Sequence, residues 1–552
     1  MTVSLSNSAG AASGAELQRY LQGVERALRA SDMETAIRLS DEAIGKGLEH
    51  SHLLALAAYR QMALGAGDRA LVFASRAREL SPRNVDVLNA LGLSYVHLKR
   101  HREAVEAFDA ALRQSPTAFM VRFNKAAALE ELQDLTRARV EFERVLDQQP
   151  SHSEALARLA SLAIQRGDVK IARDYATRAL KSDPRQPAAP LTLAMADVEE
   201  KQFERALSRV EPLTRPANTS ATNRSIAQGV KGEALEGLGR IAEAFDAFSQ
   251  SQATLRAHYR PIYAAEGYET ASMLTARLTD YFRTARAEDW RARGTVASPV
   301  RTHVFLVGFA RSGTTLLEQI LASHPDIEAM EERSCLVEAQ TEFTVPPGGL
   351  DRLAKLGADE LGSYRDAYWK RVREQGTALK RAVFIDKMPL YSVYLCVIAK
   401  LFPDARILFA RRDPRDVVLS CFRRRFVTTA QMYEFTSLET TADYYDAVMG
   451  LSDLYREKLG LDICDIRYED MVADFAGETR RICAFLDLPW NEAMERFVDV
   501  ARTRSVNTPS GPQIARGLFT QGAGQWRRYR DQLAPILPRL APWVGRFGYA
   551  PD

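Results

Sequence analysis

The chain has few cysteines, no long hydrophobic run and no excess of one charge, and each absence narrows what it can be. Its five cysteines form no C-x-x-C pair and have no histidine at zinc spacing, so we expect buried thiols of a reducing compartment. No stretch supplies the roughly 18 uncharged apolar residues of a membrane helix. Lys plus Arg number 74 against 71 for Asp plus Glu, a balance that argues against a nucleic-acid-binding surface.

The N-terminal stretch lacks both the basic start and the apolar core of a signal peptide, which favours a cytoplasmic location. At 552 residues the chain is too long for one compact core, and its 46% hydrophobic residues exclude wholesale disorder. We therefore expect a folded protein of at least two domains.

Alanines recur every 34 positions through the first half of the chain. The residues in register are Ala36, Ala70, Ala104, Ala138, Ala172 and Ala206, with Ala244 following after a four-residue insertion. Small residues let two helices approach closely, and a proline ends four of the units, at Pro82, Pro116, Pro150 and Pro184. The pattern resembles the tetratricopeptide repeat (TPR) and predicts about seven repeats over residues 17–260, after a flexible N-terminus at 1–16.

The TPR resemblance implies an all-α solenoid whose concave face binds a peptide or a partner protein of unknown identity. An irregular helical bundle is the alternative, and the constant phase of the alanines argues against it. Residues 261–298 read as a bridging helix and linker, and a second domain is expected over 299–552.

The second domain begins with a strand, a glycine-containing loop and a helix. Strand-forming HVFLVG is followed by FARSGTT and then by the helical TLLEQILASH. The spacing of Gly308, Gly313 and Thr315 matches the phosphate loop G-x4-G-K-[ST], but Thr314 replaces the lysine. Backbone N–H groups and the hydroxyls of Ser312, Thr314 and Thr315 suit an anion, whereas hydrolysis of a nucleoside triphosphate loses its charge clamp.

RSGTT after a strand resembles the 5′-phosphosulfate loop of sulfotransferases, which use 3′-phosphoadenosine 5′-phosphosulfate (PAPS) as co-substrate and release 3′-phosphoadenosine 5′-phosphate (PAP). A later stretch, DARILFARRDPRDVVLSCFRRRF, resembles the 3′-phosphate site of that family and assigns it to Arg412, Ser420 and Arg424. Two guanidinium groups and a hydroxyl suit a dianionic phosphate. The resemblance implies an α/β, P-loop-like domain with a parallel sheet and the nucleotide at the carboxyl ends of its strands.

The domain resembles the tyrosylprotein sulfotransferases most closely. A lysine in that family lies 25 or 26 residues before the 3′-phosphate arginine and contacts the sulfonate; Lys387 lies 25 before Arg412. Arg311 is the family's residue in the first loop. Glu332, 21 residues beyond Arg311, takes the place of the catalytic base, with Glu331 as its competitor. These residues imply direct in-line sulfuryl transfer without a metal.

Two further positions complete the resemblance and two depart from it. Tyr468, in IRYED, takes the family's place beside the adenine, and Ser510 takes that of a serine on the 3′-phosphate or adenine side. Gln525 stands where a basic residue usually precedes the tryptophan, which puts one nucleotide contact in doubt. Ser334 replaces the arginine that follows the base by two, which weakens the case for acidic tyrosine peptides.

The sequence therefore predicts a bacterial-type fusion of a TPR solenoid with a PAPS-dependent sulfotransferase domain. Two alternatives stay open: a P-loop kinase or NTPase, which would turn over ATP with magnesium, and a TPR adaptor whose nucleotide-binding domain is inactive. We expect the acceptor group to be a hydroxyl, such as that of a peptide tyrosine, or an amine, and the sequence leaves a peptide, a glycan, a lipid and a small molecule open as acceptors. A homodimer is compatible with the solenoid's edges and with the family's habit.

Overall fold

The computed structural model describes residues 6–215, 219–291, 296–426, 429–499 and 522–551. The chain divides into two compact units. The first contains residues 1–164 and 168–192, and the second contains residues 165–167 and 193–552. The sequence-based boundaries at residues 260 and 299 stay a prediction, since the compact units separate at a different place.

The first unit is made of helix pairs, as the 34-residue period predicts. Its helices are α1 (Ser6–Arg29), α2 (Met33–Gly45), α3 (Ser51–Ala63), α4 (Gly67–Leu80), α5 (Val85–His97), α6 (His101–Gln114), α7 (Phe119–Glu131), α8 (Leu135–Gln148), α9 (Ser153–Gln165) and α10 (Val169–Ser182), and α11 (Ala189–Glu199) crosses the division. A small residue lets two helices approach closely at Gly92 of α5, where a Cβ would lie 2.4 Å from the ring of Phe108 on α6. Helix α1 begins inside the segment expected to be flexible.

A left-handed backbone conformation recurs in the turns between paired helices at the same 34-residue period, with 38 residues between the last two turns. The residues with positive φ at these turns are Ser31, Gly65, Lys99, Gln133, Gly167, Lys201 and Gly239. Only three of the seven are glycines, so the turn geometry repeats where the residue type does not. In each turn the next residue donates its backbone N–H to the carbonyl five residues before it, as Asp32 does to Ala27 and Arg100 to Tyr95, so the cap at the helix C-terminus requires this conformation.

The second unit contains the last helices of the repeat region, which are α12 (Phe203–Val210), α13 (Ala221–Gly237) and α14 (Ile241–Tyr263). Two further helices, α15 (Ala271–Thr284) and α16 (Ala287–Trp290), lie in the segment expected to bridge to the second domain. In α13, a Cβ on Gly232 would lie 2.5 Å from the Phe248 ring of α14, which repeats the close approach seen at Gly92. Phe245 of α14 packs on Phe422 of the α/β part, with ring centroids 5.4 Å apart.

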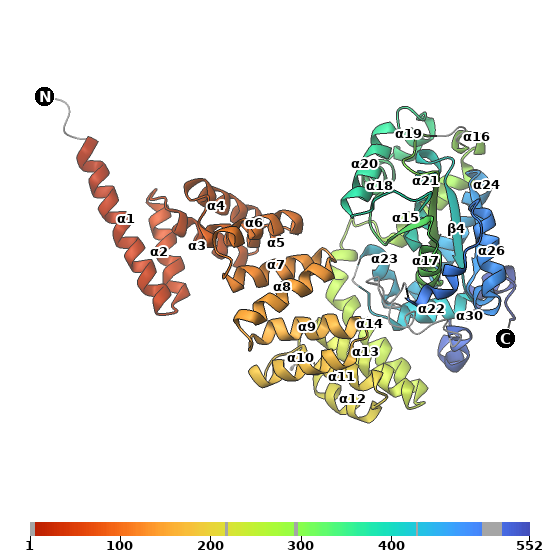
Figure 1. Ribbon diagram of the computed structural model, residues 1–552, viewed down its shortest axis with the longest axis horizontal. Helices are drawn as coiled ribbons and strands as arrows, with labels where there is room; N and C mark the ends of the chain where they lie inside the picture. Colours follow the sequence, from red (N-terminus) through yellow and green to blue (C-terminus); the bar gives the residue numbers. More distant parts are fainter. Residues whose placement is uncertain (1–5, 216–218, 292–295, 427–428, 500–521, 552) are drawn as a thin grey trace. The chain divides into compact units, whose positions relative to one another are not determined.

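A five-stranded parallel sheet forms the centre of the second unit, as expected for an α/β domain (Figure 1). Its strands are β1 (Thr302–Gly308), β2 (Ile327–Glu331), β3 (Val383–Lys387), β4 (Arg406–Arg411) and β5 (Asp462–Arg467). Their order is β2-β3-β1-β4-β5, and every neighbouring pair is parallel. Register places Leu306 beside Lys387 and Gly308 beside Ala410, so the end of β1 meets the ends of both neighbours.

Alternate residues of β1 face two separate cores. Val304 and Leu306 pack with α17 (Thr314–Ala322) and α26 (Phe475–Phe485), and Phe305 and Val307 face a larger core on the other side. The larger core draws on α15, α16 and most later helices of the unit. These are α18 (Val337–Thr344), α19 (Gly349–Lys355), α20 (Gly362–Glu374), α21 (Leu395–Leu401), α22 (Pro414–Arg423), α24 (Leu438–Lys458) and α30 (Leu537–Arg546), with the short α23 (Ala430–Tyr433) and α29 (Arg530–Leu533). The short α25 (Tyr468–Ala473) packs in the smaller core through Tyr468 and Met471.

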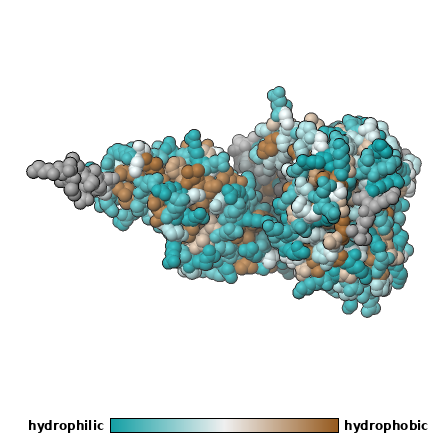
Figure 2. All heavy atoms as spheres, turned by 90° about the horizontal axis from the view of Figure 1, so that it is seen from above, coloured by the Kyte–Doolittle hydropathy of each residue, from teal (hydrophilic) through white to brown (hydrophobic). Residues whose placement is uncertain are grey.

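The expectation of buried, unpaired cysteines is confirmed, since all five are free and buried. Within the described residues, no helix is long and apolar enough to cross a bilayer. Most exposed large hydrophobic side chains belong to the first unit, including Leu64 and Val72. On the face shown in Figure 2, hydrophobic residues lie interspersed among hydrophilic ones.

Candidate active site

The loop between β1 and α17 has a backbone that only small residues permit at two positions. Gly308 has φ +152°, and a Cβ there would lie 2.5 Å from the carbonyl oxygen of Ala410. Gly313 has φ +93° and immediately precedes α17. Arg311 also has a left-handed backbone, with φ +69°, which costs about 1 kcal/mol or more and is typical of functional loops.

The N-terminus of α17 points at this loop with no side-chain cap. Its N-cap residue is Gly313, which has no side chain with which to cap the first turn. Ser312, Thr314 and Thr315 surround the helix start and are buried. Uncapped N–H groups and hydroxyls at a helix N-terminus form a favourable environment for an anion, as the sequence predicts.

Lys387 lies at the end of β3, fully buried between two carboxylates. Its Nζ donates to Oε1 of Glu332 at 2.7 Å and lies 3.4 Å from Oε2 of Glu318. Burial alone would lower the pKa of Lys387, but Glu332, Glu318 and Glu331 together raise it above its ordinary value. The structure thus brings the predicted base and the predicted catalytic lysine into direct contact.

Sequence reasoning did not single out Glu318. Its side chain is 1% exposed on α17, one helical turn after Thr314, and neither carboxylate oxygen has a hydrogen-bond partner among the described residues. Lys387 is therefore its compensating charge. The available signal was a lone carboxylate in the apolar helix TLLEQILA, because such residues are almost never fully buried unless they are paired.

Arg311 of the loop between β1 and α17 contacts the segment that follows β4. Arg311 Nε donates to Ser420 Oγ at 3.0 Å, and Arg412 Nη1 donates to the carbonyl of Arg311 at 3.2 Å. Burial, with the positive charges of Arg424 and Arg412, lowers the pKa of Arg311 to about 9. This concentration of positive charge is suited to a polyanionic ligand.

Arg424 lies near this cluster but is paired elsewhere. Its Nη1 donates to Oε1 of Glu233 on α13 at 3.1 Å, and both side chains are about one-third exposed. The neighbouring Arg423 pairs with Glu236 of the same helix and donates to Oε1 of Gln525 at 3.3 Å. No local sequence signal connects positions about 190 residues apart, so the pattern did not indicate Glu233.

Tyr468 packs against the loop between β1 and α17 at Gly313. A Cβ on Gly313 would lie 2.8 Å from Cδ2 of Tyr468, and the guanidinium of Arg412 lies 5.1 Å from the tyrosine ring centroid. Arg412 also donates to the carbonyl of Gly522 at 2.5 Å. The predicted nucleotide contact Ser510 lies outside the described residues.

Two parts of the chain match the models of known protein families. Residues 303–492 match the sulfotransferase family, and residues 52–119 and 123–187 match the tetratricopeptide repeat. The chain carries TPR repeats and a sulfotransferase domain. Both family predictions are thereby confirmed.

Individual relatives are distant. An uncharacterized protein of Aquifex aeolicus is 22% identical over 71% of this chain and 50% of its own length. A protein-tyrosine sulfotransferase of Drosophila melanogaster is 25% identical over 44% of this chain and 47% of its own. The chain thus spans about half the length of these relatives. A solved TPR protein from Parabacteroides merdae is 16% identical over 43% of this chain and 93% of its own, with a TM-score of 0.33.

Asp386 precedes Lys387 in the sulfotransferase domain and supports a pH prediction. Burial raises the pKa of Asp386 to about 7, and its Oδ2 accepts from the Tyr368 hydroxyl at 2.9 Å. Since this pKa lies above the unfolded value, the wild-type free energy of unfolding should fall as pH rises from about 4 through 7. The uncharged Asp386→Asn mutant should not show this fall. The free energy of unfolding of the mutant minus that of wild type, measured by urea denaturation, should therefore be about 3 kcal/mol larger at pH 8 than at pH 5. An equal difference at both pH values would contradict this.

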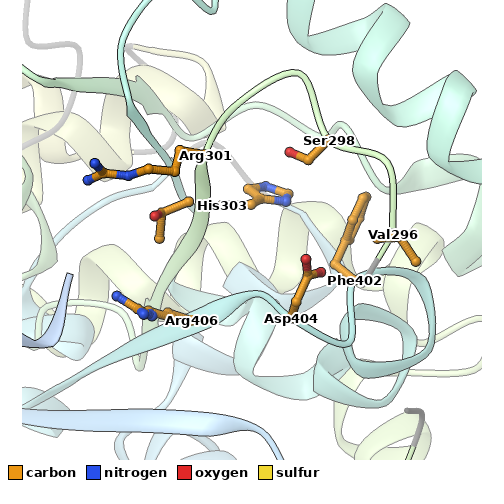
Figure 3. A pocket seen from close by; sticks show the side chains of 8 residues that line it. Val296, Ser298, Arg301, His303, Phe402, Asp404 and Arg406 are labelled. Carbon is orange, nitrogen blue, oxygen red and sulfur yellow. The ribbon is translucent and has the colours of Figure 1, made fainter. Parts of the chain in front are cut away.

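A small pocket lies at the opposite end of the sheet from the loop. It measures about 150 Å³ and is lined at the starts of β1 and β4 by Val296, Ser298, Arg301, Thr302, His303, Phe402, Asp404 and Arg406 (Figure 3). His303 is buried there, 2.9 Å from the Tyr368 hydroxyl, and burial lowers its pKa to about 3. A neutral histidine at that end of the strand has no access to the phosphate loop.

Within the described ranges, no three His, Cys, Asp or Glu side chains gather as a metal site.

Proposed function

We propose that this protein transfers a sulfuryl group from PAPS to a hydroxyl or amine acceptor. The observation that carries the proposal is the contact of Lys387 with Glu332 beside a phosphate loop that has a threonine in place of the NTPase lysine. A cation and a potential base side by side are what in-line sulfuryl transfer requires.

The donor's charges match the distribution of side chains around the loop. The N-terminus of α17, with Ser312, Thr314 and Thr315, would hold the 5′-phosphosulfate. Arg412 and Ser420, with Arg424, would hold the 3′-phosphate, and Tyr468 would lie beside the adenine. Ser510 is proposed to contact the nucleotide on its 3′-phosphate or adenine side.

Each catalytic group has a defined part in the transfer. Glu332 takes the acceptor's proton while the acceptor oxygen or nitrogen attacks sulfur. The bond between sulfur and the bridging oxygen breaks, and PAP leaves with the electron pair. Lys387 and Arg311 stabilise the charge that develops on the bridging and sulfonate oxygens, an effect larger in the transition state than in the ground state. No step needs a metal ion.

The acceptor and the role of the repeats belong to the same proposal. Similarity to a protein-tyrosine sulfotransferase supports a peptide tyrosine as acceptor, and TPR repeats support binding of a peptide or protein. A reducing, cytoplasmic setting fits five free thiols. A homodimer remains compatible with this arrangement.

Binding of PAP tests the donor assignment. Calorimetry on the full chain should show PAP binding, with little affinity for ATP and magnesium. Arg412→Ala should weaken PAP binding about 100-fold, because a charged partner of the 3′-phosphate is lost. The matched control is Arg406→Ala, at the other end of β4, where the arginine pairs with Asp487. Preference for ATP with magnesium, indifferent to Arg412, would replace this proposal with the kinase alternative. Binding of PAP without transfer from radiolabelled PAPS to any acceptor class would support the inactive adaptor.

A further inference from the structure

The last helix pair of the repeat region holds the segment that carries Arg424. Gln252 of α14 is buried, and its Nε2 donates to the carbonyl of Phe422 at 2.6 Å and to that of Arg424 at 3.0 Å. One side-chain amide therefore fixes the backbone on both sides of Arg423. The donors and acceptors are buried or partly buried, so losing the amide would leave two carbonyls unsatisfied.

The partner helix α13 holds the side chains of the same segment. Glu233 pairs with Arg424, and Glu236 pairs with Arg423 and, at 3.4 Å, with Arg528. The Arg423 guanidinium also lies 5.4 Å from the ring centroid of Phe248 on α14. Backbone and side chains of residues 422–424 are thus held by contacts from both repeat helices.

Glu233 places a negative charge beside a cluster of three arginines. Arg412 donates to the carbonyl of Arg311, and Arg311 carries a pKa that burial lowers first and the positive charges of Arg424 and Arg412 lower further. In the absence of a ligand, Glu233 supplies a compensating negative charge to Arg424. A 3′-phosphate dianion would supply the same charge from the opposite side, and two anions on one partly exposed guanidinium repel each other.

We infer that the helix pair α13–α14 is part of the donor site. Gln252 is a positioning residue that fixes the segment of Arg424, and Glu233 is the counter-ion that the 3′-phosphate displaces from Arg424. This inference rests on the proposed function, because it takes the 3′-phosphate of PAPS as the ligand of Arg424. It also means that the sulfotransferase domain from residue 299 onward is an incomplete donor site without the last repeat helices.

The test compares two nucleotides that differ only in the 3′-phosphate. Calorimetry on the full chain measures the affinities for PAP and for adenosine 5′-phosphate, and their ratio isolates the 3′-phosphate contacts from general loss of structure. Gln252→Met should lower this ratio about tenfold, because the segment of Arg424 loses two hydrogen bonds. Glu233→Gln should raise the ratio two- to fivefold, because a competing anion is removed.

Gln228→Met is the matched control. Gln228 is a buried glutamine of α13 whose Oε1 accepts from Thr254 within the helix pair at 2.9 Å, so the same substitution perturbs the repeat without touching residues 422–424. Its ratio should equal that of wild type.

The outcomes separate this inference from the proposed function. If wild type binds no PAP, both fail together. If Arg412→Ala weakens PAP binding but Gln252→Met and Glu233→Gln keep the wild-type ratio, only this inference is overturned. Should Gln252→Met not fold, the one-third exposed Glu233 decides alone, and an unchanged or lowered ratio in Glu233→Gln overturns the inference.

Discussion

Lys387→Met is expected to lower the free energy of unfolding by about 3–5 kcal/mol and to abolish sulfuryl transfer. The destabilisation follows from Glu318, which is 1% exposed and would be left as a buried carboxylate without a compensating charge. The loss of transfer follows from removing the cation proposed to stabilise the bridging oxygen. Urea denaturation and a radiolabelled PAPS assay measure the two effects.

A second substitution separates these two effects. Glu318→Gln in the Lys387→Met background should recover most of the stability, because the orphaned charge is gone, and none of the activity. Lys400→Met is the matched control. Lys400 is a buried lysine that donates to the carbonyls of Asp289 and Ala354, so its loss orphans no carboxylate and should cost about 1–2 kcal/mol, less than Lys387→Met. Equal destabilisation in both lysine mutants would argue against a special role for Glu318.

Glu332→Gln is expected to reduce kcat for sulfuryl transfer about 10²- to 10⁴-fold while leaving PAP affinity close to that of wild type. A glutamine cannot accept the acceptor's proton, and general base catalysis contributes about this factor. Glu332 is 38% exposed and Glu318 stays beside Lys387 in the mutant, so this replacement should lower the free energy of unfolding less than Lys387→Met does. Steady-state kinetics with PAPS, together with calorimetry of PAP, gives both quantities.

Glu331→Gln is the natural comparison for Glu332→Gln. The neighbouring carboxylate ends β2 and contributes to the charge around Lys387, but Glu332 accepts its hydrogen bond. A large loss of kcat in Glu331→Gln with a small one in Glu332→Gln would transfer the role of base to Glu331.

Predictions from the sequence succeeded where a property repeats or lies within one short segment. The alanine period predicted the TPR helices, and the Gly308-to-Thr315 spacing predicted a strand, a loop and a helix. These features depend on close approach of neighbouring helices and on backbone conformations that few residues adopt, and both leave a local mark in the sequence.

Contacts between distant segments were harder to predict. The grouping of Arg412, Ser420 and Arg424 stays a prediction. The sequence indicated neither the contact of Arg311 with Ser420 nor the pairing of Glu233 with Arg424. The chain carries 74 basic and 71 acidic residues, so the sequence offers many possible partners for each arginine. Only the packing of α13 and α14 against α22 selects among them.

The sequence by itself determined the two families, the strand, loop and helix around Gly308 and Gly313, and the threonine in place of an NTPase lysine, because each is a matter of residue type at fixed spacing. The tertiary structure alone decided the strand order, the burial of Lys387 between Glu332 and Glu318, and the hold of the last repeat helices on residues 422–424. Burial and ion pairing are properties of surfaces brought together from far along the chain. Their free energies therefore depend on which segments meet, and this is decided only when the whole unit packs.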